Sequence, residues 1–389
     1  MVQPLIIDCD PGIDDVLALI LAFKSPEVDV RAVTLTHGNT TLKHVKRNAV
    51  TLMDVMAAQH IEDEKNGMKS QKQSTVLAVG RATPLNSDQV FATEFHGHDG
   101  LGNIYEQGLH TAPTDWENQL LHDAEKVGEQ NKPFQSTSRD AADEILHQLR
   151  VADPLSVSIL AIGPLTNLAL AMQRDVQTFS RAKDIIILGG SLTAGNITPY
   201  GEFNFVADPV AADLVMTASK GFVNTEQGAK SRFDLLSQGK SAPMHIVVLP
   251  IDSAECGAIP ASVYRKQILP LRGSAPLYTF INSFLLHAFK AMEELFKFDY
   301  MATYDAFAMI LLLDMLNGTL EKNWCWKWHD MRVETAGKYT MGMSCIDTRD
   351  WESPDGSWND QSNVVQVITK ASGDNFIQSF MKRIFNVDV

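Results

Sequence analysis

The sequence predicts an α/β fold, an open and mostly parallel sheet with a mixed edge and helices on both faces. Short apolar runs rich in isoleucine and valine alternate along the chain with longer helical patterns, and this alternation is typical of βαβ units. The apolar runs are residues 5–7, 28–35, 156–162, 185–188 and 245–251. Helices are expected between them at residues 16–23, 165–172 and 210–217.

The 389 residues are predicted to form a single domain, because 45% of them are hydrophobic and can supply a large core. Two polar stretches, residues 57–75 and 111–139, interrupt the alternation. We interpret them as surface insertions or loops, since the patterns on either side continue one series. Near the C-terminus, residues 332–347 alternate like antiparallel strands, and residues 374–384 are expected to form a closing helix.

Charge and composition favour a small-molecule partner. The formal net charge of −14 repels phosphate backbones and anionic lipid surfaces, which argues against nucleic acid and membrane as partners. The N-terminal residues do not read as a signal peptide, and the longest later apolar run, residues 306–313, is far shorter than the roughly 20 residues of a membrane span. The four cysteines have no paired spacing, as expected of reduced thiols. We therefore expect a soluble cytoplasmic protein.

Acidic residues gather just past the first predicted strand, where open α/β sheets bind ligands. Asp8, Asp10, Asp14 and Asp15 lie within eight residues, and such carboxylates would repel one another unless a cation lay between them. Oxygen ligands without His or Cys favour calcium or magnesium over zinc, and calcium tolerates irregular geometry. The alternative is that Asp14 and Asp15 only cap the helix that starts at Val16.

These acids resemble the signature of the inosine-uridine-preferring nucleoside hydrolases, a strand followed by Asp-x-Asp-Pro-Gly-x-Asp-Asp, which stands here at residues 8–15. The resemblance extends over nearly the whole chain. Further matching motifs lie at residues 38–39, 96–100, 162–167, 195–196, 202–204, 208–209, 305 and 337–343. The family resemblance implies a Rossmann-like nucleoside hydrolase fold. It also implies hydrolysis of the N-glycosidic bond of ribonucleosides to free base and ribose, as in nucleoside salvage.

The resemblance also implies roles for particular residues. A calcium ion would be held by the carboxylates of Asp10, Asp15 and Asp305 and by the backbone carbonyl of Ile162, and Asp10 would take the proton from a calcium-bound water. His96 would lie in the loop that closes over the base. The remaining substrate contacts would be Asp14, Asn39, Asn196, Glu202, Phe203 and Asn204. Members of such families form homodimers or homotetramers, and we expect the same of this chain.

One departure concerns the leaving base. Tyr304 stands where better-known members have His, and residues 252–255 replace the more usual Asp-x-Thr-His. A tyrosine with a reference pKa near 10 is a weaker acid at neutral pH than histidine. This leaves open a nucleoside-binding protein with lost or weak hydrolysis. An aspartate-dependent phosphatase also places Asp-x-Asp after a first strand, but Gly12 stands where that family usually has Thr or Val.

Overall fold

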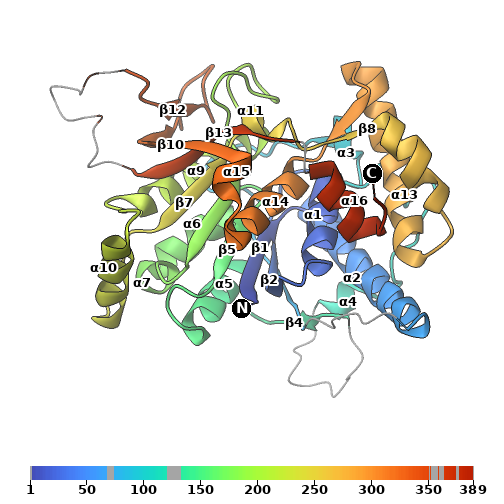
Figure 1. The fold of residues 1–389 in the computed structure, drawn as a ribbon, viewed down its shortest axis with the longest axis horizontal. Helices are drawn as coiled ribbons and strands as arrows, with labels where there is room; N and C mark the ends of the chain where they lie inside the picture. Colours follow the sequence, from blue (N-terminus) through green and yellow to red (C-terminus); the bar gives the residue numbers. More distant parts are fainter. Residues whose placement is uncertain are drawn as a thin grey trace.

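The computed structural model describes residues 2–67, 74–120, 133–349, 351, 358, 363–373 and 376–388. Within them, a nine-stranded sheet with the strand order β10-β13-β7-β6-β5-β1-β2-β3-β4 forms the centre of the molecule (Figure 1). Neighbouring strands are parallel except for β10, which pairs antiparallel with β13 at one edge. The strands are β1 (Gln3–Cys9), β2 (Val28–Leu35), β3 (Val76–Val79), β4 (Gln135–Ser136), β5 (Ser158–Ala161), β6 (Asp184–Leu188), β7 (His245–Leu249), β10 (Trp324–His329) and β13 (Val365–Ala371). The predicted mostly parallel sheet with a mixed edge is confirmed.

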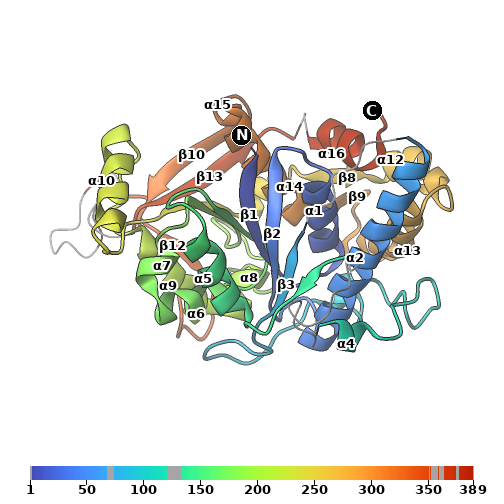
Figure 2. The same ribbon diagram turned by 90° about the horizontal axis from the view of Figure 1, so that it is seen from below.

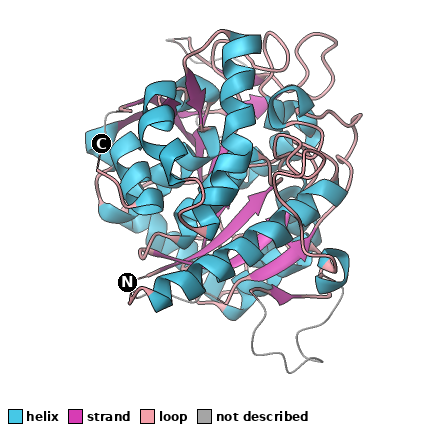
Figure 3. Ribbon diagram, turned by 90° about the vertical axis from the view of Figure 1, so that its right-hand side faces the viewer, coloured by secondary structure: helices cyan, strands magenta, loops and turns pink. Residues whose placement is uncertain are grey.

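Helices cover both faces of the sheet, as the sequence predicts (Figures 2 and 3). One face carries α1 (Ile13–Phe23), α2 (Leu42–Lys65), α13 (Pro276–Ala291), α14 (Tyr304–Asn317) and α16 (Phe376–Phe385). The other carries α5 (Ala141–Val151), α6 (Thr166–Arg174), α7 (Val176–Phe179) and α9 (Pro209–Met216). Because side chains alternate along a strand, Leu5 and Ile7 of β1 face the first core and Ile6 faces the second.

Shorter elements complete the chain. The predicted antiparallel tail is present as β11 (Met331–Val333) paired with β12 (Ser344–Ile346), and a second hairpin-like pair joins β8 (Ala258–Pro260) to β9 (Tyr300–Ala302). The remaining helices are α3 (Thr93–His96), α4 (Trp116–Gln119), α8 (Phe203–Ala207), η1 (Thr217–Ser219), α10 (Glu226–Ser237), α11 (Ile251–Ala254), α12 (Ala261–Val263), η2 (Tyr264–Ile268), η3 (Leu269–Leu271), η4 (Met292–Phe296) and α15 (Leu320–Asn323). Among the described residues, no helix is both long and apolar enough to cross a bilayer.

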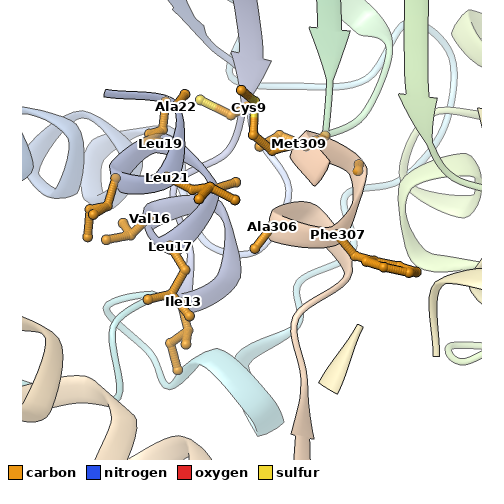
Figure 4. Close-up of a cluster of buried hydrophobic side chains, with 14 of the residues drawn as sticks. Cys9, Ile13, Val16, Leu17, Leu19, Leu21, Ala22, Ala306, Phe307 and Met309 are labelled. Carbon is orange, nitrogen blue, oxygen red and sulfur yellow. The ribbon is translucent and has the colours of Figure 1, made fainter. Parts of the chain in front are cut away.

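Helices α1 and α14 pack against each other beside β1. Apolar side chains of both helices, among them Leu21, Ala306 and Met309, belong to one buried core that also contains Cys9 (Figure 4). Ten of the eleven residues of α1 are buried, including the two acids in its first turn. The packing brings the N-terminal ends of the two helices together at the carboxyl end of β1.

Several boundaries differ from the sequence prediction. Residues 57–65, predicted as part of a surface insertion or loop, form the last turns of α2. Their polar character misled the prediction, because Gln59 and Asp63 are buried and hydrogen-bonded to each other, and Asp63 also pairs with Lys24. The second polar stretch, residues 111–139, contains helix α4 and strand β4.

Parts of the predicted segments, residues 68–73, 121–132 and 374–375, lie outside the described residues. The predicted strand 245–251 stops at Leu249, where Pro250 has no N–H to continue the ladder.

Candidate functional site

Three buried carboxylates meet where the first turns of α1 and α14 converge. Asp14 and Asp15 lie in the first turn of α1, and Asp305 is the second residue of α14. One carboxylate oxygen from each lies within 4.8 Å of the other two. Helix N-termini favour negative charge, but three charges this close repel one another strongly in a buried site. The arrangement is therefore suited to a cation.

Asp15 ties this cluster to the loop that follows β1. Its Oδ1 accepts from the backbone N–H of Asp10 at 3.0 Å, and its Oδ2 accepts from the N–H of Gly12 at 3.0 Å and from Nδ2 of Asn39 at 2.7 Å. Gly12 is the N-cap of α1, so Asp15 does cap the helix, as the alternative interpretation held. The same side chain also belongs to the carboxylate cluster.

One oxygen of the Asp10 carboxylate is hydrogen-bonded, and the other has no hydrogen-bond partner in the part of the chain that the structure describes. Its Oδ2 accepts from the backbone N–H of Asn39 at 2.6 Å, whereas Oδ1 is buried and has no hydrogen-bond partner among the described residues. Two glycines leave room for it: a Cβ at Gly163 would lie 2.5 Å from Oδ1, and one at Gly38 would overlap Oδ2. A buried anionic oxygen without a partner is costly, and a cation would supply one.

Burial raises the pKa of every carboxylate here, and neighbouring negative charges add to the effect for Asp10, Asp14 and Asp305. Burial is the largest cause for all four; the charge of Asp15 adds to it for Asp10, and that of Asp14 for Asp305. The pKa values of Asp10 and Asp305 lie well above their usual range, that of Asp14 is raised to about 8, and that of Asp15 is also raised. Without a cation the cluster therefore retains protons that a divalent ion would displace. The all-oxygen donor set fits a hard ion such as calcium.

Asp8 does not join the cluster, which corrects the prediction of one site from four neighbouring acids. Its Oδ1 accepts from Thr34 Oγ1 at 2.5 Å and from Asn167 Nδ2 at 2.9 Å. The side chain thus links β1 to β2 and α6, and burial raises its pKa to about 7. The fourth acid of the region is Asp305, which is distant in sequence.

The predicted backbone ligand lies at the end of β5. The N–H of Ile162 donates to the carbonyl of Asp8 at 2.9 Å, which fixes Ile162 beside β1. Its carbonyl accepts from Asn204 Nδ2 at 3.2 Å, and the same nitrogen donates to the carbonyl of Leu188 at 3.2 Å. Asn204 therefore bridges the ends of β5 and β6, and a carbonyl oxygen with two lone pairs can still accept one more partner.

Backbone N–H groups donate hydrogen bonds to the side chains of Glu202 and Asn196. Glu202 is the N-cap of α8, and its carboxylate accepts from the N–H groups of Asn204, Phe205 and Gly190 at 2.8 to 3.1 Å. Burial raises its pKa to about 7, against the opposing effect of these hydrogen bonds. Asn196 is exposed, and its Oδ1 accepts from the N–H of Phe203, a buried residue, at 2.9 Å. These contacts hold the loop in place and leave only part of each polar side chain for a ligand.

His96 lies at the end of α3 and is buried against the start of α1. Its Nδ1 accepts from the N–H of Ile13 at 3.0 Å, which places the ring proton on Nε2, 3.9 Å from Asp14 Oδ1. Burial lowers the pKa of His96 to about 3, so the ring is neutral at pH 7. The structure brings His96 next to Asp14, a pairing that the sequence did not indicate.

A second polar group lies beside the carboxylates. The hydroxyl of Tyr304 donates to Glu255 Oε2 at 3.0 Å, and that of Tyr300 donates to Glu255 Oε1 at 2.9 Å. Burial and then the charge of Glu255 raise the pKa of Tyr304 far above its usual range, and the charge of Asp14 adds to the effect. Sequence reasoning missed Tyr300 and the link to Glu255. The signal was that Glu255 closes the segment that departs from Asp-x-Thr-His.

The chain is thus an α/β protein with a mostly parallel sheet. At the carboxyl ends of its strands lies a cluster of carboxylates that could hold a cation. The family model described as inosine-uridine preferring nucleoside hydrolase matches residues 5–378. The chain belongs to this family.

Relatives and solved structures agree with that assignment. A probable uridine nucleosidase 1 of Oryza sativa subsp. japonica is 38% identical over 216 residues, 55% of this chain and 55% of that protein, so the chain spans about half the length of this relative. The pyrimidine-specific ribonucleoside hydrolase RihA of Klebsiella pneumoniae is 28% identical over 349 residues, 89% of each chain. A purine-preferring ribonucleoside hydrolase from Gardnerella vaginalis shares the fold, with a TM-score of 0.72 and 20% identity over 99% of this chain and 98% of that one.

Proposed function

We propose that this protein hydrolyses the N-glycosidic bond of ribonucleosides to free base and ribose. The observation that carries the proposal is the buried cluster of Asp14, Asp15 and Asp305 at the strand edge of a chain that belongs to the nucleoside hydrolase family. Relatives are named for pyrimidine and for purine nucleosides. The proposal therefore names ribonucleosides as a class.

The ion that fits this site best is calcium, with Asp15 and Asp305 of the cluster, the neighbouring Asp10 and the carbonyl of Ile162 as its ligands, while Asp14 faces the ribose. Carboxylate and carbonyl oxygens at an irregular loop are typical calcium ligands. The unpartnered Oδ1 of Asp10 supports this set. When bound, such an ion lowers the pKa of a coordinated water and so supplies a nucleophile at neutral pH.

Asp10 is the base in this scheme. Its Oδ2 is held by the N–H of Asn39, so the proton of the attacking water would go to Oδ1, which has a second lone pair besides the one that faces the ion. The departing base leaves an oxocarbenium-like sugar, which anions and amides around the ribose stabilise. Asp14 and Asn39 lie nearest to the cluster for that purpose. The remaining ribose contacts would come from Asn196, Glu202, Phe203 and Asn204, with His96 beside Asp14.

The protein offers little acid assistance to the departing base. Tyr304 is the candidate group, but its proton is donated to Glu255, so the leaving base would depart with little help from an acid. A nucleoside-binding protein of the same fold with weak hydrolysis remains the second candidate because of this observation. The phosphatase alternative is disfavoured by the family match.

Location and assembly complete the proposal. All four cysteines are free, which supports a reducing, cytoplasmic setting. A homodimer or homotetramer is proposed from the family resemblance alone.

The ribose contacts can be tested with uridine and 2′-deoxyuridine. We expect the specificity constant for deoxyuridine to be lower by roughly 5- to 150-fold, because losing one hydroxyl leaves a buried polar group unpaired at a cost of about 1 to 3 kcal/mol. The measurement is release of reducing sugar from each nucleoside at matched calcium concentration. Ribose and deoxyribose added as inhibitors serve as the control for binding. Equal specificity constants would contradict the assigned ribose contacts.

A further inference from the structure

Glu255 accepts a hydrogen bond from two tyrosines that come from different parts of the chain. Tyr300 belongs to β9 and Tyr304 begins α14, while Glu255 directly follows α11. The two phenol oxygens bind different oxygens of one carboxylate, at 2.9 and 3.0 Å. Both oxygens of the Glu255 carboxylate are therefore engaged by a phenol.

The backbone around this group is held firmly. Both the N–H and the hydroxyl of Thr303 donate to the carbonyl of Gly257 at 2.7 Å, and Ala258 pairs with Ala302. A Cβ at Gly257 would overlap the side chain of Phe307 on α14, so only glycine lets the two segments approach this closely. The positions of Glu255 and Tyr304 are thus fixed relative to each other by bonds that do not involve their own side chains.

The direction of the hydrogen bonds follows from donor counting. A carboxylate can only accept, and a phenol has one proton. Because Tyr304 donates its proton to Glu255, its oxygen can only accept from any further partner. Tyr304 directly precedes Asp305, a member of the carboxylate cluster, in the first turn of α14.

We propose that Glu255 is a positioning residue that turns the hydroxyl proton of Tyr304 away from the leaving base. This inference rests on the proposed hydrolysis and adds a residue that controls how the reaction depends on its leaving group. Bases that need a proton to depart are slowed by the contact, whereas a leaving group that departs as an anion is not. Removing Glu255 frees the phenol to donate toward the site.

The test is a double-mutant cycle read with two substrates. Inosine carries a base that leaves better when protonated, and 4-nitrophenyl riboside carries a phenolate that leaves unaided. The quantity compared is the ratio of their specificity constants, nitrophenyl riboside over inosine. We expect Glu255→Ala to lower this ratio by about fivefold, the size of one hydrogen bond. In the Tyr304→Phe background, Glu255→Ala should leave the ratio unchanged.

Tyr300→Phe is the matched comparison, because it removes the other phenol and keeps the bond between Tyr304 and Glu255. It should change the ratio by less than about twofold. A ratio that responds equally to Glu255→Ala with and without the Tyr304 hydroxyl would overturn the inference, and so would an unchanged ratio in the single variant. A purely structural role would alter both substrates alike.

A spectroscopic measurement separates this inference from the proposed function. The tyrosine Fermi doublet in the Raman spectrum reports whether a phenol donates or accepts, and the difference between the wild type and Tyr304→Phe isolates Tyr304. We expect a strong-donor signal in this difference, and its loss when the same difference is taken in the Glu255→Ala background, where Tyr300 has lost its partner in both proteins. If the signal persists without Glu255, the inference is wrong, whatever the turnover. If the signal disappears but the wild type releases no ribose, the proposed function fails while the contact stands.

Discussion

Asp10→Asn is expected to lower kcat by more than about a thousandfold, since it removes the proposed base and weakens one proposed ligand of the ion. The amide has nearly the shape of the carboxylate and can still accept from the N–H of Asn39, which now binds Oδ2 at 2.6 Å. Folding should therefore be preserved. The measurement is single-turnover ribose release from inosine, together with thermal unfolding of both proteins.

Asp8→Asn is the matched control for this change. Asp8 lies two residues away and is equally buried, but its contacts are with Thr34 and Asn167 and not with the carboxylate cluster. We expect the control to retain turnover within about tenfold, because an amide oxygen can still accept both hydrogen bonds. The assignment of Asp10 fails if its variant keeps more than a few per cent of the wild-type rate, or if Asp8→Asn is equally inactive.

Asp305→Ala should abolish the stabilisation of the protein by calcium. In the folded protein without metal, burial and neighbouring charges raise the pKa of Asp305 well above its usual range and that of Asp14 to about 8. A raised folded pKa stabilises the fold below the unfolded value, near pH 4, and this stability is lost as the pH rises through the folded pKa. The free energy of unfolding of the metal-free wild type should therefore fall between about pH 4 and 8.

Calcium should reverse that fall in the wild type, because ion binding displaces the retained protons. In Asp305→Ala, the pH dependence without metal should be shallower, and added calcium should have little effect on unfolding. Asp314→Ala is the control on the same helix, since Asp314 accepts from Thr319, Asn323 and Trp324 at the other end of α14. It should lower stability but keep the calcium response. Equal calcium affinity of Asp305→Ala and the wild type by calorimetry would remove Asp305 from the ligand set.

The sequence predicts the buried half of this fold well and its edges poorly. Strands β1, β5, β6 and β7 contain continuous apolar runs because helices cover both of their faces, and β2 has apolar residues at Val28, Val30 and through most of its buried second half. The short strands β3 and β4, the last two at one end of the sheet, carry too few residues for a pattern, with four and two residues respectively. The last turns of the long helix α2 are assigned by the sequence to a surface insertion or loop because they bury polar side chains that satisfy one another, as Gln59 and Asp63 do.

The site, like the fold, has features that the sequence predicts and features that it does not. Acids that follow one strand were visible as a motif, and the family resemblance supplied Asp305 from a distant segment. Which acids share a site depends on where side chains point, and the motif alone could not separate Asp8 from Asp15. Glu202 illustrates a further limit, because its engagement with three backbone N–H groups follows from the path of the loop. The link between Glu255 and two tyrosines likewise needed the fold to bring α11, β9 and α14 together.

Calcium-dependent hydrolysis can be measured as ribose release from a mixture of ribonucleosides, by protein that is first stripped with a calcium chelator and then titrated with calcium. We expect that stripping abolishes ribose release and that calcium restores it in proportion to occupancy of a single high-affinity site per chain. Full ribose release in the presence of excess chelator would contradict the role of the ion. Tight nucleoside binding without any ribose release, at saturating calcium, would contradict hydrolysis itself.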